Sequence, residues 1–347
     1  MSMVRLTIDG SEVEVPKGST ILEAAEQASI RIPTLCYHKR LPPIGSCNMC
    51  IVEVEGEKEP VCSCNTAVAD GLVVTTDSKP LHEQRTANLK KILKHHPLDC
   101  PICDKAGECE LQDIVYEFGI DEAPYQPREE KRDDIYSTTL IRYWPERCIM
   151  CGRCAAACRD IKEIGVLEIQ GEEENKRLVV VAADKCVSCG ECLSVCPTGA
   201  LTENLSRYKG RPWLVKKVQT TCTYCGCGCQ LELNVLDNRV IGVTTDVDTG
   251  VNQGSLCVKG RFGYEFIGDE SRLKKPLIKE NGVLREASWE EALNTVAEKF
   301  KAICDQHGPD SIAGLTSAKC TNEENFLFQK FMRAVIGTNN VDHCARL

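Results

Sequence analysis

The chain has 347 residues, of which 42% are hydrophobic, and a formal net charge of −9. This length allows several domains, and the acidic balance argues against a nucleic-acid partner because phosphate binding needs concentrated positive charge. The sequence does not open on a basic segment, apolar core and cleavage site, and it has no apolar run long enough to span a bilayer. We therefore expect a cytoplasmic protein, in which the 24 cysteines bind metal rather than form disulfides.

The first 78 residues predict a small β-rich domain. Hydrophobic side chains alternate over 4–8 and again over 13–15, and Asp9-Gly10 between them is typical of a hairpin turn. The other elements expected here are a short helix beginning near Ser19 or Thr20 and strands over IVEVEG and LVVTT.

The middle of the chain contains several cysteine clusters. A helical stretch around 79–96 precedes the cysteines at 100–109, and the charged segment 119–140, which includes REEKRDD, is expected to be a solvated linker. CIMCGRCAAAC at 148–158 and CVSCGECLSVC at 186–196 then share the same three spacings. Such an internal repeat implies two similar metal sites.

The carboxyl-terminal part combines one more cysteine cluster, at 222–229, with ordinary α/β sequence. LELNV and RVIGV flank Asp237-Asn238 as a predicted hairpin. Two amphipathic helices and one strand beyond it leave much apolar surface uncovered, so we expect the beginning of a larger α/β domain. These three elements are a helix from a Ser288-x-x-Glu291 capping box to about residue 304, a strand over SIAGLTS, and a helix from a Thr321-x-x-Glu324 box to near Gly337.

The repeated motif is the strongest indication of iron–sulfur clusters. Each run has the C-x2-C-x2-C-x3-C spacing and the second ends in Cys196-Pro197, a bacterial ferredoxin pattern in which the fourth cysteine of each run ligates the other cluster. Zinc knuckles are the alternative, but tetrahedral zinc sites usually use two paired loops and do not need triple runs. The expected [4Fe–4S] ligand sets are Cys148, Cys151, Cys154 and Cys196 for one cluster and Cys186, Cys189, Cys192 and Cys158 for the other.

Four cysteines of the amino-terminal domain have the spacing C-x10-C-x2-C-x13-C, which resembles the [2Fe–2S] site of the electron-input domains of NADH dehydrogenases and hydrogenases. The resemblance implies a β-grasp fold and places the fourth ligand at Cys64, just before Asn65, although Cys62 competes with it. The loop at Gly45 and Ser46 is able to bring backbone N–H groups toward cluster sulfurs, a contact that raises the reduction potential. The implied ligands are Cys36, Cys47, Cys50 and Cys64.

A histidine precedes three cysteines in the next cluster, with the spacing H-x3-C-x2-C-x5-C. This pattern resembles the [4Fe–4S] site with one histidine and three cysteine ligands that lies beside the previous domain in the same families. Neighbouring His95 is the alternative histidine. A neutral imidazole in place of a thiolate makes the cluster less negative and should raise its potential. The implied ligands are His96, Cys100, Cys103 and Cys109.

The last cysteine cluster has the spacing C-x2-C-x3-C-x27-C and is followed by Lys259-Gly260-Arg261. It resembles the [4Fe–4S] domain of molybdenum or tungsten enzymes with paired pyranopterins, especially formate dehydrogenases. In that family a lysine at the position of Lys259 lies between the cluster and the nearer pterin, which implies a role in electron transfer. The implied ligands are Cys222, Cys225, Cys229 and Cys257, and the cysteines left over as expected buried, inert thiols are Cys62, Cys227, Cys304, Cys320 and Cys344.

The order of these motifs resembles the catalytic subunit of cytoplasmic formate dehydrogenases over essentially the whole chain. The resemblance implies an α+β multi-domain protein whose full-length form binds a molybdenum- or tungsten-bis-pterin guanine dinucleotide, with electron-transfer partner subunits linked to NAD(P), ferredoxin or hydrogenase. The expected domains are a β-grasp [2Fe–2S] ferredoxin at 1–78, a histidine-ligated [4Fe–4S] module at 79–119, a double [4Fe–4S] ferredoxin at 138–208, the [4Fe–4S] domain of bis-pterin enzymes at 215–271, and an incomplete α/β molybdopterin oxidoreductase domain at 272–347.

The last residues, SAKCTNEENFLFQKFMRAVIGTNNVDHCARL, resemble the stretch of those enzymes that leads to the metal-binding selenocysteine or cysteine. We expect a selenocysteine codon after Leu347 that was read as a stop, so that the chain relays electrons but contains no catalytic residue. A codon other than TGA at that point would rule this out. Trimming, deliberate truncation or a genuine short subunit would give a similar sequence.

Three other functions fit part of the sequence. The large iron–sulfur subunit of NADH dehydrogenase shares the first two modules and the last motif, but it typically keeps a reduced cysteine set where both ferredoxin runs are intact here. An iron-only hydrogenase shares the arrangement through residue 196 but not residues 222–261. A non-catalytic adaptor fits the length, although exposed amphipathic helices would then need a tightly bound partner.

Overall fold

The computed structural model describes the chain except for residues 1, 123–124, 129–133, 173–174 and 345–347. The described chain divides into two compact units, Met1–Lys216 and Lys217–Leu347, and each is described by itself below. Within the described residues, no helix combines the length and the hydropathy needed to cross a membrane.

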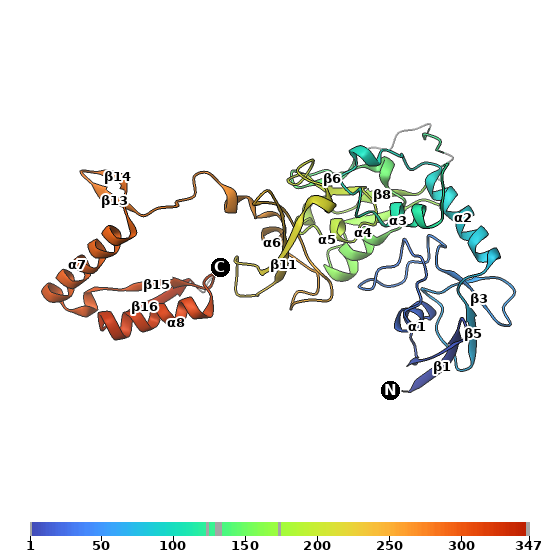
Figure 1. Cartoon of the computed structure of the whole chain (residues 1–347), viewed down its shortest axis with the longest axis horizontal. Helices are drawn as coiled ribbons and strands as arrows, with labels where there is room; N and C mark the ends of the chain where they lie inside the picture. The colour runs from blue at the N-terminus through green and yellow to red at the C-terminus, as the bar shows by residue number, and fades with distance from the viewer. Residues whose placement is uncertain (1, 123–124, 129–133, 173–174, 345–347) are drawn as a thin grey trace. The chain divides into compact units, whose positions relative to one another are not determined.

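The first unit begins with a five-stranded sheet in the order β2-β1-β5-β3-β4. Figure 1 labels its strands β1, β5 and β3. The predicted hairpin is confirmed, because Asp9 and Gly10 both have positive φ between two antiparallel strands, as a type I′ turn requires. β1 is parallel to β5, and a short helix with a Thr20–Glu23 capping box packs its apolar side into the same core. The elements are β1 (Met3–Ile8), β2 (Ser11–Pro16), α1 (Ile21–Gln27), β3 (Ile51–Val54), β4 (Val61–Cys62) and β5 (Leu72–Thr75).

A second apolar core lies under the next two helices, α2 (Lys79–Leu93) and α3 (Glu110–Glu117). Its fully buried side chains come from three parts of the sequence and include Leu35, Leu89 and Leu111. Three cysteine-bearing segments therefore pack together through this core, and the residues that bring them there are Cys47, Cys109 and Ile149.

The internal repeat is visible in the backbone. Met150 and Ser188 occupy the same position in the two runs and both have positive φ. Gly152 and Gly190 follow in the left-handed conformation, and each begins a short helix. The elements of this region are β6 (Ile141–Tyr143) paired with β9 (Leu201–Glu203), β7 (Leu167–Gln170) paired with β8 (Arg177–Val180), α4 (Arg153–Ala156) and α5 (Glu191–Ser194).

One residue near the end of the predicted linker, Tyr136, is packed, whereas Ile135, Ser137 and Thr139 around it are exposed, as a solvated segment requires. Residues 129–133 of that segment lie outside the described residues, but Tyr136 is only 8% exposed. Asp134 pairs with Arg142 on β6 at 3.4 Å, which fixes the segment beside the repeat. The composition of 119–140 did not predict this packing, because among the described residues of the segment only Tyr136 is buried.

The second unit starts with the three-stranded sheet β10-β11-β12, in which β11 and β12 are antiparallel. The hairpin predicted at Asp237-Asn238 is confirmed, since both residues have positive φ between β11 and β12. A short helix packs on this sheet, and the Tyr264 hydroxyl that follows it donates to the Ile241 carbonyl at 3.0 Å. The elements are β10 (Lys216–Thr221), β11 (Gln230–Leu236), β12 (Arg239–Thr244) and α6 (Val258–Phe262).

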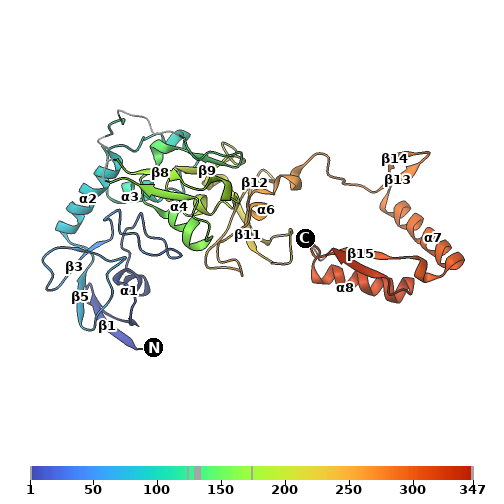
Figure 2. The same ribbon diagram turned by 180° about the vertical axis from the view of Figure 1, so that it is seen from behind.

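Residues 272–347 form helices and strands with little core of their own. The helix α8 lies along the strands β15 and β16 in both views (Figures 1 and 2), but neither α7 nor α8 has a buried residue. Leu293 and Phe326 are 60% and 65% exposed, so the expectation of uncovered apolar surface is confirmed. The elements are β13 (Leu277–Glu280), β14 (Val283–Glu286), α7 (Trp289–His307), β15 (Gly314–Ser317), α8 (Asn322–Phe331) and β16 (Val341–Cys344).

Two details of this region differ from the prediction. The helix α7 ends at His307 rather than near residue 304. The next residue, Gly308, has a positive φ and ends the helix. Only half of its capping box forms, because the Glu291 carboxylate pairs with Arg285 at 2.6 Å instead of turning back to Ser288. The Thr321–Glu324 box is complete, and the helical turn after α8 ends at Gly337 as predicted.

Candidate metal centres

All 24 cysteines lie in the described residues, and every one is a free thiol. Within the described residues, no three histidine, cysteine or acidic side chains converge closely enough to hold a single metal ion. Thiolates that hold a cluster surround a core of several iron and sulfur atoms, so they stand farther apart than the ligands of one ion.

Four predicted ligands of the repeat line one cavity. The fourth of them, Cys196, comes from the other run and lies beside Cys151 and Cys154, which is the predicted crossover geometry. Burial raises the pKa of Cys154 well above its usual value, and the nearby thiolates raise it further. Such a group of buried thiolates is stable only around a cationic partner, which iron supplies. The four cysteines are Cys148, Cys151, Cys154 and Cys196.

The other four cysteines of the repeat also gather in space. The pKa of Cys192 is raised to about 12, chiefly by burial and also by Cys189, Cys158 and Cys186, while the hydroxyl of Tyr136 acts in the opposite direction. Cys158 also accepts a hydrogen bond from the Val166 N–H at 3.3 Å. Both predicted sets of the repeat are thus brought together by the fold.

The amino-terminal site is organised by a loop of backbone N–H groups. Cys36 Sγ accepts from the N–H of Ser46 at 3.3 Å and of Cys47 at 3.4 Å, as the loop at Gly45 led us to expect. A hydrogen bond from the Cys47 side chain is the main cause that lowers the pKa of Cys36 to about 6. These donors favour a thiolate at Cys36, the form that ligates iron.

Cys62 and Cys64 both lie beside Cys50, whose pKa their hydrogen bonds lower to about 3. Cys64 is fully buried, whereas Cys62 is partly exposed and donates to Asn48 Oδ1 at 3.4 Å. Burial fits Cys64 better to a cluster shielded from water. The choice between the two remains a prediction.

The two histidines of the next site differ in environment. His95 Nδ1 lies 2.8 Å from the Gln126 carbonyl, so this nitrogen already has a partner. His96 Nδ1 is buried without a hydrogen-bond partner, and burial lowers the pKa of His96 to about 4. A neutral imidazole with an unpaired nitrogen suits a metal ligand, so the site favours His96.

Of the three cysteines of this site, Cys100 begins a 3-10 turn, Cys103 follows that turn directly, and Cys109 is the N-cap residue of α3. Burial raises the pKa of Cys109 to about 11. Gly199 of the repeat approaches Cys103 so closely that a Cβ at residue 199 would overlap its Sγ. The histidine module and the repeat therefore share one packed boundary.

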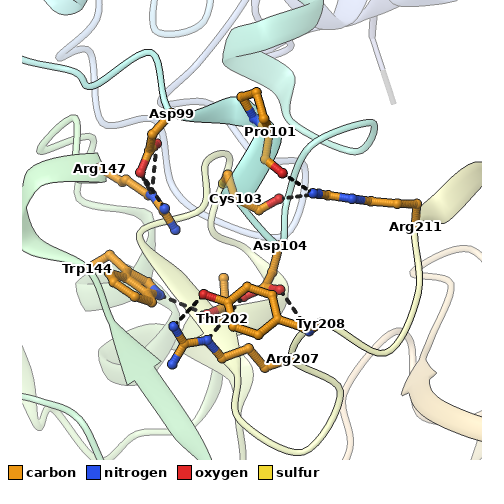
Figure 3. Close-up of polar contacts among 10 residues, drawn as sticks. All are labelled: Asp99, Pro101, Cys103, Asp104, Trp144, Arg147, Thr202, Arg207, Tyr208 and Arg211. Atoms are coloured by element: carbon orange, nitrogen blue, oxygen red, sulfur yellow. Dashed lines mark hydrogen bonds and ion pairs between the residues drawn. The ribbon is translucent and has the colours of Figure 1, made fainter.

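Buried arginines hold that boundary together, and no cysteine spacing predicted them. Figure 3 shows Arg147, which is 3% exposed, bonded to Asp99 through Nε at 3.2 Å and Nη2 at 2.5 Å. Its guanidinium lies 4.5 Å from the centre of the Trp144 ring. The contacts join residues 48 positions apart, so short-range patterns carry no trace of them.

Further contacts of the same kind surround this pair (Figure 3). Arg211 donates to the carbonyl of Cys103 at 2.6 Å and to that of Pro101. Arg153, which is 2% exposed, makes two 2.7 Å bonds to Glu110 on α3. Charged hydrogen bonds of this kind are stronger than neutral ones and fix the relative placement of the cysteine loops.

The last cysteine cluster lies in the second unit, on the loop between β10 and β11. The Cys222 N–H donates to the Cys229 carbonyl at 2.8 Å and closes this loop. Gly260 on α6 packs beside Cys222, where a Cβ would lie 3.5 Å from Sγ, and this brings the helix that begins at Cys257 to the loop. Cys225 is exposed. The four predicted ligands are thus on neighbouring elements.

Two other residues of this site need comment. Lys259 is exposed on α6, two residues after Cys257. Cys227 Sγ lies 3.6 Å from Cys229 Sγ. The expectation that the spare cysteines are buried is wrong, since Cys227, Cys320 and Cys344 are exposed and Cys62 and Cys304 are partly so. Most of them lie in loops or in the region without a core, which offers no interior to bury them.

Comparisons with known proteins agree with this order of sites. The matched families are the 2Fe-2S iron-sulfur cluster binding domain over residues 1–79, the NADH-ubiquinone oxidoreductase-G iron-sulfur binding region over 85–124, the 4Fe-4S dicluster domain over 147–200, the molybdopterin oxidoreductase Fe4S4 domain over 215–269 and molybdopterin oxidoreductase over 272–347. The matched domains are thus iron–sulfur cluster domains followed by the beginning of a molybdopterin oxidoreductase domain. The presence of the expected [2Fe–2S], [4Fe–4S] and molybdopterin oxidoreductase domains is confirmed by these matches.

The curated relatives carry the names of several different oxidoreductases. The chain is 41% identical to the NADPH-Fe(3+) oxidoreductase subunit alpha of Geobacter sulfurreducens over 99% of its length and 40% of that protein. It is 42% identical to a component of an NADH-quinone oxidoreductase of Rhizobium meliloti, with the same coverage. A putative formate dehydrogenase of Staphylococcus aureus is 34% identical over 98% of the chain and 39% of that protein. The chain thus spans about 40% of the length of these relatives.

A solved structure is also similar. The crystal structure of an NAD+-reducing [NiFe]-hydrogenase in the H2-reduced state matches with a TM-score of 0.55 and 29% identity. The match covers 60% of this chain and 90% of the hydrogenase chain.

Proposed function

We propose that residues 1–347 are the electron-transfer part of a molybdenum or tungsten bis-pterin oxidoreductase. In this proposal, the twenty predicted ligands hold one [2Fe–2S] and four [4Fe–4S] clusters. The observation that carries it is the single cavity lined by Cys148, Cys151, Cys154 and Cys196. Two runs far apart in the sequence have no reason to place four thiols around one cavity unless a shared group fills it.

The proposed route runs between the pterin site and the amino-terminal clusters. It is supported by the apolar core that Cys47, Cys109 and Ile149 share, because adjacent sites in a dry, rigid interior suit rapid electron transfer. At the other end, Lys259 is proposed to lie between the Cys222–Cys257 cluster and the pterin. We assign no catalytic residue within residues 1–347.

Iron analysis of the anaerobically purified chain tests the assignment. We expect about 18 iron atoms per chain, the sum for one [2Fe–2S] and four [4Fe–4S] clusters. Cys196→Ser should remove about four of them, whereas Cys304→Ser, a change outside the predicted sets, should remove none. Unchanged iron content and unchanged EPR spectra in Cys196→Ser would contradict the crossover.

The histidine site needs a separate experiment. His96→Ala should abolish one cluster or alter its EPR spectrum, because the substitution removes the predicted imidazole ligand of that cluster. His95→Ala is the matched control, since His95 Nδ1 lies beside the Gln126 carbonyl. The opposite result, a change only in His95→Ala, would move the ligand by one residue.

We propose formate and carbon dioxide as the substrate pair, with NAD(P)-, ferredoxin- or hydrogenase-linked subunits as partners. The support is the carboxyl-terminal motif together with the relatedness to a putative formate dehydrogenase. A codon for selenocysteine after Leu347 stays a hypothesis within this proposal, and the genomic sequence tests it.

The second candidate is a pyridine-nucleotide-linked reductase of another acceptor. It is favoured by the 41% identity to an NADPH-Fe(3+) oxidoreductase and the 42% identity to an NADH-quinone oxidoreductase component. Full-length protein with its partner subunits separates the two. Formate-dependent dye reduction supports the first candidate, and dye reduction with NADPH or NADH but not formate supports the second.

A further inference from the structure

The hydroxyl group of Tyr136 lies against two cysteines of the repeat. Its oxygen is 3.4 Å from Cys192 Sγ and 3.8 Å from Cys186 Sγ, both within reach of a hydrogen bond to sulfur. The side chain is 8% exposed, so water does not compete strongly for this donor. Tyr136 belongs to none of the cysteine motifs and enters the site from the segment that precedes them.

A set of hydrogen bonds holds Tyr136 in this position. Asp134 Oδ1 accepts from the Ser137 N–H at 3.0 Å and from the Tyr136 N–H at 3.4 Å, which makes a tight turn. Arg142 pairs with Asp134 at 3.4 Å, and Ser137 Oγ accepts from the Tyr143 N–H at 2.9 Å. The turn is therefore tied to β6 at two points, and the phenol is directed by the fold.

We propose that the Tyr136 hydroxyl donates a hydrogen bond to the Cys192 and Cys186 thiolates and thereby raises the reduction potential of the cluster they hold. The inference rests on the proposed ligand set Cys158, Cys186, Cys189 and Cys192. Reduction adds negative charge that spreads onto the cysteine sulfurs, so a fixed donor stabilises the reduced form more than the oxidised form. Tyr136 thus acts on the potential through the ligands.

The substitution Tyr136→Phe removes the donor and keeps the ring that fills the site. We expect the equilibrium constant for one-electron reduction of this cluster to fall threefold to tenfold, about 28 to 59 mV in potential. The other clusters of the same molecule are internal references and should keep their potentials. Tyr116→Phe, at a tyrosine that is 77% exposed, is the matched control and should change nothing.

The measurement is an EPR-monitored redox titration of the anaerobically purified chain. An unchanged set of potentials in Tyr136→Phe, with full iron content, would overturn the inference. Asp134→Asn is a second variant that keeps the phenol and weakens its anchor, so it should shift the same cluster in the same direction by less. A shift in the opposite direction would also overturn the inference.

A spectroscopic test does not depend on any variant. In the reduced wild-type protein, electron–nuclear double resonance should detect a proton coupled to this cluster that exchanges in D2O, and its absence would contradict the hydrogen bond. Cys192→Ser separates this inference from the ligand assignment. If that variant keeps all its iron, the assignment fails. If it loses iron while Tyr136→Phe leaves the potentials unchanged, only the role of Tyr136 fails.

Discussion

Helices are stabilised differently in the first unit and in residues 272–347. In the first unit, α2 buries Leu89 completely, and the arginines around the cysteine loops are almost fully buried. In residues 272–347, no residue of α7 or α8 is fully buried, and the side chains of Ser288 and Thr321 cap the N-termini of these helices. Tertiary packing therefore specifies the first unit, while local sequence specifies the helices of residues 272–347.

Iron removal should separate the two regions most strongly. Anaerobic chelation is expected to unfold the cysteine loops of residues 100–203, because the free energy of metal binding is part of the folding free energy there. The helices α7 and α8 carry no predicted ligand and should keep their amide protection. Hydrogen exchange read by mass spectrometry measures amide protection in both regions at once. Equal loss of protection would contradict the proposed difference between them.

A matched pair of leucine substitutions comes next in size. Leu89→Ala in the buried core should destabilise the first unit by about 3 kcal/mol, since it removes packed methyl groups and leaves a cavity. Leu293→Ala, at a side chain that is 60% exposed, should change stability by less than about 0.5 kcal/mol. Denaturant unfolding followed by hydrogen exchange gives both values. A large effect of Leu293→Ala would mean that α7 has a partner in solution.

The arginines allow a similar test with charge. Arg147→Met should lower the free energy of unfolding by about 2 kcal/mol, because it removes all the hydrogen bonds to Asp99 from a site where Arg147 is 3% exposed. Arg285→Met removes bonds of similar length to Glu280 and Glu291 on an exposed surface. Water solvates these exposed groups and salt screens their charges, so no measurable loss of stability is expected. Thermal unfolding at low and high salt distinguishes the two cases.

The smallest expected effect concerns the cap of α8. Thr321→Ala should destabilise this helix by about 1 kcal/mol, since it removes the acceptor for the Glu324 N–H. Thr321→Asn, which keeps an acceptor, is the control and should be close to wild type. Amide exchange in the first turn of α8 reports the difference. If both variants behave alike, local capping does not hold the helix, and the contrast between the regions weakens.

Short-range patterns were sufficient for much of the fold. The hairpins at Asp9-Gly10 and Asp237-Asn238 and the capping box at Thr321 formed as predicted, because each depends on residues within a few positions. The predicted ligand sets could be formulated from spacing for the same reason, since most ligands lie in tight loops.

Long-range contacts were not accessible in this way. The strand β16 forms only because β15, 27 residues earlier, offers a parallel edge, as between Gly314 and Val341. The Asp99–Arg147 pair and the approach of Tyr136 to Cys192 likewise join distant positions through space. In one sequence, nothing marks an arginine or a tyrosine as the partner of a particular cysteine loop.

Gly199 has a practical consequence for protein engineering. A side chain at this position would collide with Cys103 Sγ, so the segment after the repeat and the histidine module are packed together without space for a larger residue. A chimaera that takes the double ferredoxin from this chain and the preceding module from another would have to reproduce that fit atom by atom. Because the core that contains Leu35, Leu89 and Leu111 also joins the amino-terminal domain to this pair, the transferable unit is residues 1–208, and designers of synthetic electron-transfer chains should cut after it.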